Sequence, residues 1–246
     1  MPGSEPSYIA YSPARERNSV KANLPEPSIA LAPRTSAERA ARYVRRLIFD
    51  GHLHPFDRVP QVEVAAALGI SRIPLREALI ALEREGWVTI EPNRGAFVNA
   101  LDEAAVRDHF ELYGLTFGLA ARRAIERDPE TLVAELETLA GAAALQDDVT
   151  EFGRLAVAFH EAIVDASASP RIRVVLRAIS TLIPGNFFAI VPNSIGIERE
   201  GLVDLLATIR RRDADATCDE YLKLMRLQAD QVVLLLQERK LFDVSG

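Results

Sequence analysis

Residues 61–98 read QVEVAAALGISRIPLREALIALEREGWVTIEPNRGAFV, and this stretch decides the fold of the N-terminal part of the chain. Val62, Ala65 and Leu68 have helical spacing, and Gly69 follows them as a helix terminator. Residues 71–74 are predicted to form a turn, and a second helix is expected over residues 75–85. The pattern therefore predicts two short helices joined by a tight turn.

Two short strands are expected directly after the second helix. Residues 87–90 (WVTI) and 96–98 (AFV) are apolar and rich in strand-forming side chains, and residues 92–95 (PNRG) between them have turn composition. Helix, turn, helix and a two-stranded wing is the layout of a winged helix-turn-helix. The second helix of that motif lies in the major groove of DNA.

Length and composition indicate an ordinary globular protein with two modest domains. The chain has 246 residues, of which 48% are hydrophobic and 26% charged. No apolar run reaches the roughly 18 residues that span a bilayer, and residues 1–19 lack the apolar core of a secretory signal. Cys218 is the single cysteine, so an internal disulfide framework is excluded. A cytoplasmic protein without a membrane partner is expected.

The net charge of −6 is distributed unevenly along the chain. Residues 36–100 carry nine Arg against eight acidic residues, which gives +1. Residues 101–246 carry 16 basic against 24 acidic residues, which gives −8. A near-neutral, Arg-bearing domain joined to an acidic one is compatible with DNA binding through a local patch.

The fold class is predicted to be mainly α: an N-terminal winged helix-turn-helix plus a C-terminal all-helical antiparallel bundle of six or seven helices. Residues 1–35 are rich in Pro and polar side chains and are expected to form a disordered tail. Residues 36–100 are assigned to the DNA-binding domain and residues 101–246 to the bundle. Bundle helices are expected over residues 103–127, 129–145, 150–166, from 170 onward, 198–212 and 215–241, with residues 186–197 as an irregular connection.

The residues predicted to contact DNA lie at the start of the second helix of the motif. Ser71 is placed to cap this helix, and Arg72 and Arg76 are four residues apart on one face. Guanidinium groups there can pair with guanine or clamp a phosphate, whereas the alternative is ordinary surface pairing with Glu77 or Glu83. Pro74 is expected to fix the backbone and allow close approach to DNA.

Further contacts to DNA are expected from the wing. Arg94 and Gly95 form its predicted tip, where glycine admits close backbone approach to the minor groove. Arg58, before the motif, is expected to reach a backbone phosphate.

The stretch SRIPLREALIALEREGWVTIEPNRGAFV resembles the signature of the GntR family of bacterial transcription regulators, and the resemblance covers about residues 37–100. The segment LHPFDRV also fits, although Pro55-Phe56 stands where Pro-Gly is usual. The downstream part is similar to the helical FCD effector domain of the FadR-type subfamily. The resemblance implies a homodimer on a palindromic operator of double-stranded DNA, controlled by a small ligand in the bundle.

Many FCD domains hold a divalent metal, but this chain departs from that pattern. The resemblance aligns the four ligand positions with Ala156, His160, Leu202 and Tyr221, so only one imidazole remains. One imidazole does not retain a metal. No metal and no other cofactor is therefore expected.

The resemblance also places an effector pocket in the bundle. Tyr113 and Phe117 stand where many relatives carry Arg and Glu, and Phe159, His160 and Tyr221 are expected beside them. Such a pocket suits a hydrophobic or aromatic effector. His160 is either a hydrogen-bonded core residue or a contact to the ligand, and the sequence leaves both open.

The sequence favours a ligand-responsive DNA-binding transcription regulator, a repressor, over two other classes. An enzyme is not expected, because there is no glycine-rich phosphate loop, no G-x-S-x-G, and His160-Glu161 does not continue as H-E-x-x-H. The remaining alternative is a helical scaffold or DNA-architectural protein that binds no ligand.

Overall fold

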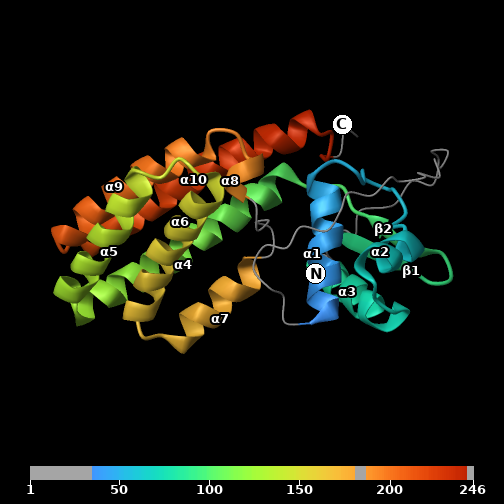
Figure 1. Ribbon diagram of the computed structural model, residues 1–246, viewed down its shortest axis with the longest axis horizontal. Helices are drawn as coiled ribbons and strands as arrows, with labels where there is room; N and C mark the ends of the chain where they lie inside the picture. The colour runs from blue at the N-terminus through green and yellow to red at the C-terminus, as the bar shows by residue number, and fades with distance from the viewer. Residues whose placement is uncertain (1–34, 181–186, 243–246) are drawn as a thin grey trace, which may run out of the picture.

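The computed structural model describes residues 35–180 and 187–242. It confirms the predicted fold class: a small winged helix-turn-helix domain is followed by a helical domain (Figure 1). The expected tail over residues 1–35 lies outside the described residues except for Thr35. That residue already belongs to the domain, because its hydroxyl accepts from the Glu38 N–H while the Glu38 carboxylate accepts from the Thr35 N–H. This reciprocal cap starts the first helix.

The DNA-binding domain contains three helices and two strands. They are α1 (Ser36–Phe49), α2 (Gln61–Leu68), α3 (Arg72–Arg84), β1 (Val88–Glu91) and β2 (Gly95–Val98). Gly69 is left-handed with φ 61° and ends α2 as expected. The prediction for α3 was wrong at its start: residues 72–74 form the first helical turn rather than the connecting turn. Val62 is also largely exposed, because Val64 and Leu68 make the buried face of α2.

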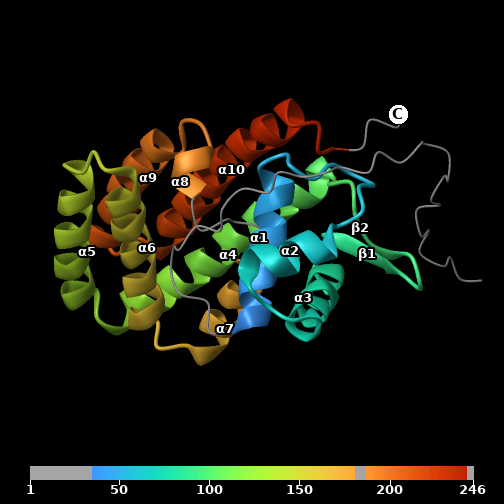
Figure 2. The same cartoon turned by 45° about the vertical axis from the view of Figure 1, so that its right-hand side comes forward.

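The wing is an antiparallel hairpin with Val88 opposite Val98 and Glu91 opposite Gly95. A third segment extends it, since Arg58 forms a bridge with Phe97 and the Val59 N–H donates to the Ala96 carbonyl. Figure 2 shows the hairpin projecting from the domain beside α2 and α3. The loop before α2 is thereby fixed to the wing.

The helical domain contains seven helices in the described part of the chain. They are α4 (Glu103–Arg127), α5 (Pro129–Ala144), α6 (Val149–Ala166), α7 (Pro170–Ile179), α8 (Phe187–Ile190), α9 (Ser194–Arg210) and α10 (Ala214–Glu238). Asp or Ser side chains accept from the first-turn N–H groups of α4, α5, α6, α7 and α10. The expected irregular connection over 186–197 is corrected, because α8 forms there and α9 begins at Ser194.

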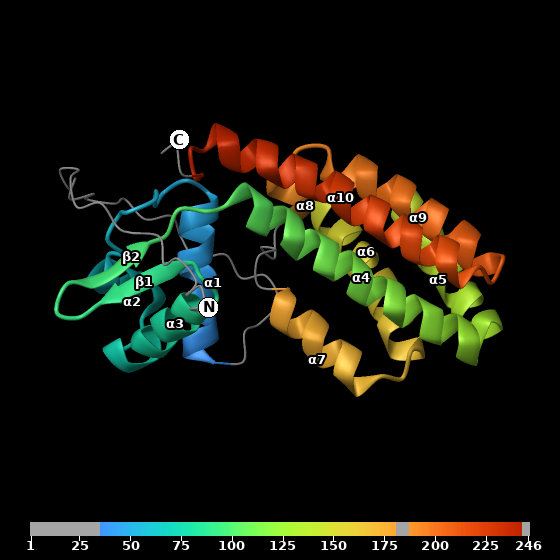
Figure 3. The same ribbon diagram turned by 180° about the vertical axis from the view of Figure 1, so that it is seen from behind.

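Helices α4 and α10 run side by side along the whole domain, as Figure 3 shows. Two glycines permit their close approach: a Cβ at Gly114 would meet the Tyr221 carbonyl oxygen at 3.2 Å, and one at Gly118 would meet Cys218 at 3.2 Å. Helix α10 also packs on α9, and α6 packs on α4 and α5. The interior between α4, α6, α9 and α10 is therefore enclosed by four helices.

The end of α10 is attached to the DNA-binding domain. The Arg239 guanidinium donates to the main-chain carbonyl of Phe49 and lies 3.6 Å from the Asp50 carboxylate. The main-chain N–H of Leu101 donates to the Leu241 carbonyl at 3.0 Å. The two domains are thus joined at α10 as well as through the linker before α4. Among the described residues, no helix combines the length and apolar character needed to cross a membrane.

Candidate DNA interface and effector site

The start of α3 presents two free cationic side chains to solvent. Arg72 and Arg76 are exposed and one helical turn apart, whereas Leu75 and Leu79 of the same helix are buried. Within the described residues neither forms an ion pair, and the alternative pairing with Glu77 or Glu83 is not present: Glu83 instead accepts from the Ile90 N–H at 2.7 Å. Both guanidinium groups remain available for an external anion or base edge.

The structure places Ser71 at the start of α3 and Pro74 in its first turn. Ser71 occupies the cap position of α3, but its hydroxyl makes no capping hydrogen bond. Pro74 lies within the first helical turn, where its missing N–H costs no intrahelical hydrogen bond. The first-turn N–H groups of α3 therefore have no side-chain cap at the end where Arg72 projects.

Ile73 is an additional candidate that the sequence reasoning missed. Ile73 is 72% exposed in the first turn of α3. An exposed apolar group beside two arginines can contact the methyl group of thymine in a major groove. The sequence prediction placed residue 73 in a turn before the helix. Its exposed position in the first turn of α3 was therefore not recognised.

Arg58, Arg94 and Gly95 come together on the wing. Gly95 has φ 109°, and a Cβ there would lie 2.9 Å from Nε of Arg58, so the Arg58 side chain lies across the glycine. The Arg94 guanidinium pairs with Glu91 and lies 5.6 Å from the centroid of the Phe97 ring. Arg94 must leave these partners to enter a groove, whereas Arg58 is exposed beside the hairpin.

The five residues predicted for the effector pocket are in mutual contact, and we call them the aromatic cluster: Tyr113, Phe117, Phe159, His160 and Tyr221. Phe117 stacks on Tyr221 with centroids 5.4 Å apart and packs edge-on against Tyr113 at 4.9 Å. Phe159 and Tyr221 are wholly buried. Helices α4, α6 and α10 each contribute to this cluster.

A buried hydrogen-bonded group lies against the aromatic cluster, and we call it the polar cluster: His160, Glu198, Tyr221 and Gln228. His160 Nε2 is 2.7 Å from Oε1 of Glu198, and His160 Nδ1 is 3.1 Å from the Tyr221 hydroxyl. Gln228 donates from Nε2 to Oε2 of Glu198 at 3.0 Å and to the Ser194 carbonyl at 3.1 Å. Glu198 is 3% exposed and Gln228 2%.

The polar cluster changes the ionisation of both tyrosines. Burial, followed by the charges of Glu198 and Glu161, raises the pKa of Tyr113 to about 12. Burial and the Glu198 charge raise the pKa of Tyr221 well above its usual value. Both phenols therefore keep their protons at neutral pH, and the Tyr221 hydroxyl lies within hydrogen-bond distance of His160 Nδ1.

The residues at the metal positions implied by the family do not fit a divalent ion. Ala156 and Leu202 are buried apolar side chains, and the two imidazole nitrogens of His160 are engaged by Glu198 and Tyr221. In the parts of the chain that the structure describes, no three His, Cys, Asp or Glu side chains are grouped to hold a metal. A hydrogen-bonded cluster occupies this part of the bundle.

Glu198 and Gln228 were missed by sequence reasoning, and they add buried polar groups beside the residues predicted for the effector pocket. Glu198 was taken as the first residue of its helix, but α9 begins one turn earlier and turns this side chain inward. Gln228 follows Tyr221 by seven residues, which is two helical turns. That spacing alone would have placed both side chains on one face of α10.

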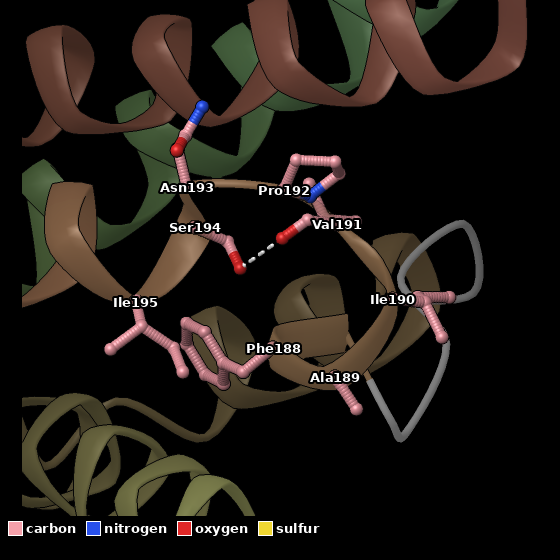
Figure 4. Close-up of a pocket in the computed structure, with 8 residues that line it drawn as sticks. All are labelled: Phe188, Ala189, Ile190, Val191, Pro192, Asn193, Ser194 and Ile195. Carbon is pink, nitrogen blue, oxygen red and sulfur yellow. Dashed lines mark hydrogen bonds between the residues drawn. The ribbon is translucent and has the colours of Figure 1, made fainter. Parts of the chain in front are cut away.

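Two open depressions lie on the helical domain. One, of about 390 Å³, is lined by Arg199, Glu200, Val203 and Asp204. The other, of about 280 Å³, lies at the turn between α8 and α9, where the Ser194 hydroxyl donates to the Val191 carbonyl at 2.7 Å (Figure 4). The second depression borders the polar cluster, because the Ser194 carbonyl accepts from Gln228.

Comparison with protein families finds two matches along the chain. Residues 36–98 match the family described as bacterial regulatory proteins, gntR family, and residues 104–226 match the FCD domain. The chain is similar to the HTH-type transcriptional regulator Rv0043c of Mycobacterium tuberculosis, at 29% identity over 82% of this chain and 83% of that protein. It is also similar to the HTH-type transcriptional repressor RspR of Escherichia coli, at 33% identity over 39% of this chain and 42% of that protein.

Solved structures share the fold at lower sequence identity. Escherichia coli McbR/YncC matches with a TM-score of 0.58 and 18% identity, covering 83% of this chain and 98% of that one. A putative transcriptional regulator GntR from Rhodococcus sp. RHA1 matches with a TM-score of 0.52 and 23% identity, covering 80% and 97%.

Proposed function

Because the chain belongs to the gntR family of bacterial regulatory proteins and carries an FCD domain, we propose that it is a ligand-controlled repressor. Its activity as a transcription regulator follows from the family. The proposal adds three features: a homodimer, a palindromic operator, and release of the operator when a small ligand binds in the helical domain. One relative is named a repressor, which supports that direction of control.

The observation that carries the proposal is the exposed start of α3. Arg72 and Arg76 project from the first turns without a carboxylate partner in the described residues, and Ile73 lies exposed beside them. A surface that leaves two guanidinium groups unpaired is suited to bidentate contacts with guanine, while Ile73 reads a thymine methyl. Arg58, Arg94 and Gly95 on the wing add contacts to the phosphate backbone and the minor groove.

An apolar stripe on α4 supports the homodimer. Leu112, Leu115 and Leu119 recur at helical spacing and are 55%, 52% and 43% exposed. A second copy of the chain that packs against this stripe would remove it from water and place two α3 helices on one DNA duplex. Two-fold symmetry of the protein then requires two-fold symmetry of the operator.

Ligand control is proposed to act through α10. This helix contributes Tyr221 and Gln228 to the polar cluster and is followed directly by Arg239, which is attached to α1. A ligand that repacks the clusters changes the position of α10 and so the freedom of the DNA-binding domain. The change in the free energy of operator binding is set by the difference between the ligand's binding free energies in the DNA-bound and DNA-free states of the protein.

Selection of bound sequences from random DNA tests the proposal. The expected result is an inverted repeat whose half-sites are separated by about one helical turn, bound by a dimer in sedimentation experiments. Recovery of DNA without a common sequence would contradict a sequence-specific regulator and favour an architectural protein. Leu115→Asp should shift the dimer toward monomer, while Leu145→Asp, at an exposed leucine of α5's end, should leave it intact.

A further inference from the structure

The hydrogen-bond donors of the polar cluster all point toward acceptors within the protein. An ionised carboxylate only accepts, so His160 Nε2 carries the proton in its 2.7 Å contact with Glu198. His160 Nδ1 lies 3.1 Å from the Tyr221 hydroxyl, so both imidazole nitrogens have partners inside the cluster.

The orientation of the Gln228 amide is fixed by its two partners. Both the Ser194 carbonyl and the Glu198 carboxylate are acceptors, so the NH₂ group must face them and Oε1 must face the other way. Oε1 is buried and has no hydrogen-bond partner. A buried acceptor without a donor costs about 1–3 kcal/mol, so a group that donates to it is favoured.

Two carboxylates lie in or near the cluster. Glu198 is a buried carboxylate, and the exposed Glu161 adds a second negative charge near Tyr113. The nearest arginine in sequence, Arg199, is directed elsewhere: it donates to the Gln146 carbonyl at 2.8 Å and lies over the Phe152 ring. An anionic ligand would thus meet a carboxylate, with no metal ion to neutralise it.

We propose that the effector of this protein is a hydrogen-bond donor with an apolar body, such as an aromatic amine or amidine, rather than a carboxylate. The apolar part packs beside the rings of the aromatic cluster, and the cationic head group donates to Oε1 of Gln228, close enough to Glu198 to be attracted by its charge. This inference rests on the proposed ligand control and names the ligand class of that site.

Matched probe pairs test the proposal on the full chain. The pairs are benzamidine with benzoate and phenethylamine with 3-phenylpropionate, so each pair shares its apolar part and differs in head group. Thermal unfolding is measured with a chelator present. At about ten times its dissociation constant the amine or amidine should raise Tm by roughly 3–6 °C, and the carboxylate should not.

Two variants locate the binding. Glu198→Gln should abolish the Tm increase caused by the amines, whereas Glu200→Gln, the same change at an exposed position of α9, should retain it. The probe comparison in the unmodified protein stands even if Glu198→Gln fails to fold. Stabilisation by the carboxylates instead, or no Tm increase with either amine at millimolar concentration, would overturn the proposal.

Operator binding separates this inference from the proposed function. If the amines raise Tm but leave operator affinity unchanged, the ligand class is supported and ligand control of DNA binding fails. If operator binding is sequence-specific but no amine raises Tm, the inference fails and the DNA-binding function stands.

Discussion

The Arg239 guanidinium, directly after α10, donates a hydrogen bond to the main-chain carbonyl of Phe49 at the end of α1. Phe49 belongs to the DNA-binding domain, and α10 carries Tyr221 and Gln228 into the polar cluster. One uninterrupted helix therefore contacts both the proposed effector site and the domain that contains α3. This arrangement connects the proposed effector site to the domain that contains α3 by a second route besides the linker.

Arg239→Met should loosen this connection while keeping the apolar stem of the side chain. The hydrogen bond to Phe49 and the ion pair with Asp50 are lost, which should cost about 1.5–3 kcal/mol in the free energy of unfolding. Urea unfolding measures the loss. Lys240→Met, at the exposed neighbouring position, should change the same free energy little, and an equal loss in both variants would contradict the role given to Arg239.

Phe56→Gly should stabilise the protein. Phe56 has φ 71°, a left-handed conformation that costs a non-glycine residue roughly 1–2 kcal/mol, and its N–H is held by the Val98 carbonyl at 2.8 Å. The ring is 53% exposed and recovers little of this cost. We expect the free energy of unfolding to rise by about 1 kcal/mol. Phe56→Ala keeps a side chain in the left-handed backbone conformation, so the free energy of unfolding should not rise. If it rises as much as in Phe56→Gly, removal of the ring is the cause rather than relief of the backbone.

Phe56 also illustrates what the sequence could and could not predict. The GntR-like motif identified the position as one where glycine is usual, but only the backbone shows that Phe56 adopts the glycine conformation. The winged helix-turn-helix and the long bundle helices followed from periodicity and caps. The first turn of α3 could not be predicted in this way, because proline is common both in turns and in the first turn of a helix.

Gly95→Ala should weaken the wing. The backbone at φ 109° disfavours any side chain, and the added Cβ would displace the Arg58 guanidinium that lies over the glycine. The expected cost is about 1–3 kcal/mol in the free energy of unfolding, together with weaker operator binding. Gly141→Ala is the matched control: it lies within α5 with no atom within 4 Å of a Cβ, so the same change should stabilise by about 0.5–1 kcal/mol.

His109 should make stability depend on pH. Burial lowers its pKa from 6.5 to about 4, so between these values the unfolded chain binds a proton that the folded protein does not. The free energy of unfolding should therefore fall as pH drops from about 6.5 to about 4, by on the order of 2–3 kcal/mol. Urea unfolding at several pH values should show a smaller decrease for His109→Gln. Identical decreases would exclude His109 as the cause.

The proposed effector site was predictable only in part. Periodicity and the family resemblance placed the five residues of the aromatic cluster correctly in contact, since each lies on the inner face of a long helix. Glu198 escaped prediction because a charged side chain is rarely buried, and its place depends on partners from α6 and α10 that are far away in the sequence. Long-range polar pairing leaves no periodic signal within one helix.

The central claim is that the start of α3 reads DNA sequence. The most direct test is fluorescence anisotropy with DNA that flanks the protein's own gene, at several salt concentrations, using the unmodified protein, Arg72→Ala/Arg76→Ala, and Arg84→Ala as a control at the far end of α3. We expect tight, sequence-selective binding that weakens by about 1–3 kcal/mol for each lost base contact in the double variant and persists in Arg84→Ala. Equal binding by all three proteins, fading alike with salt, would contradict it.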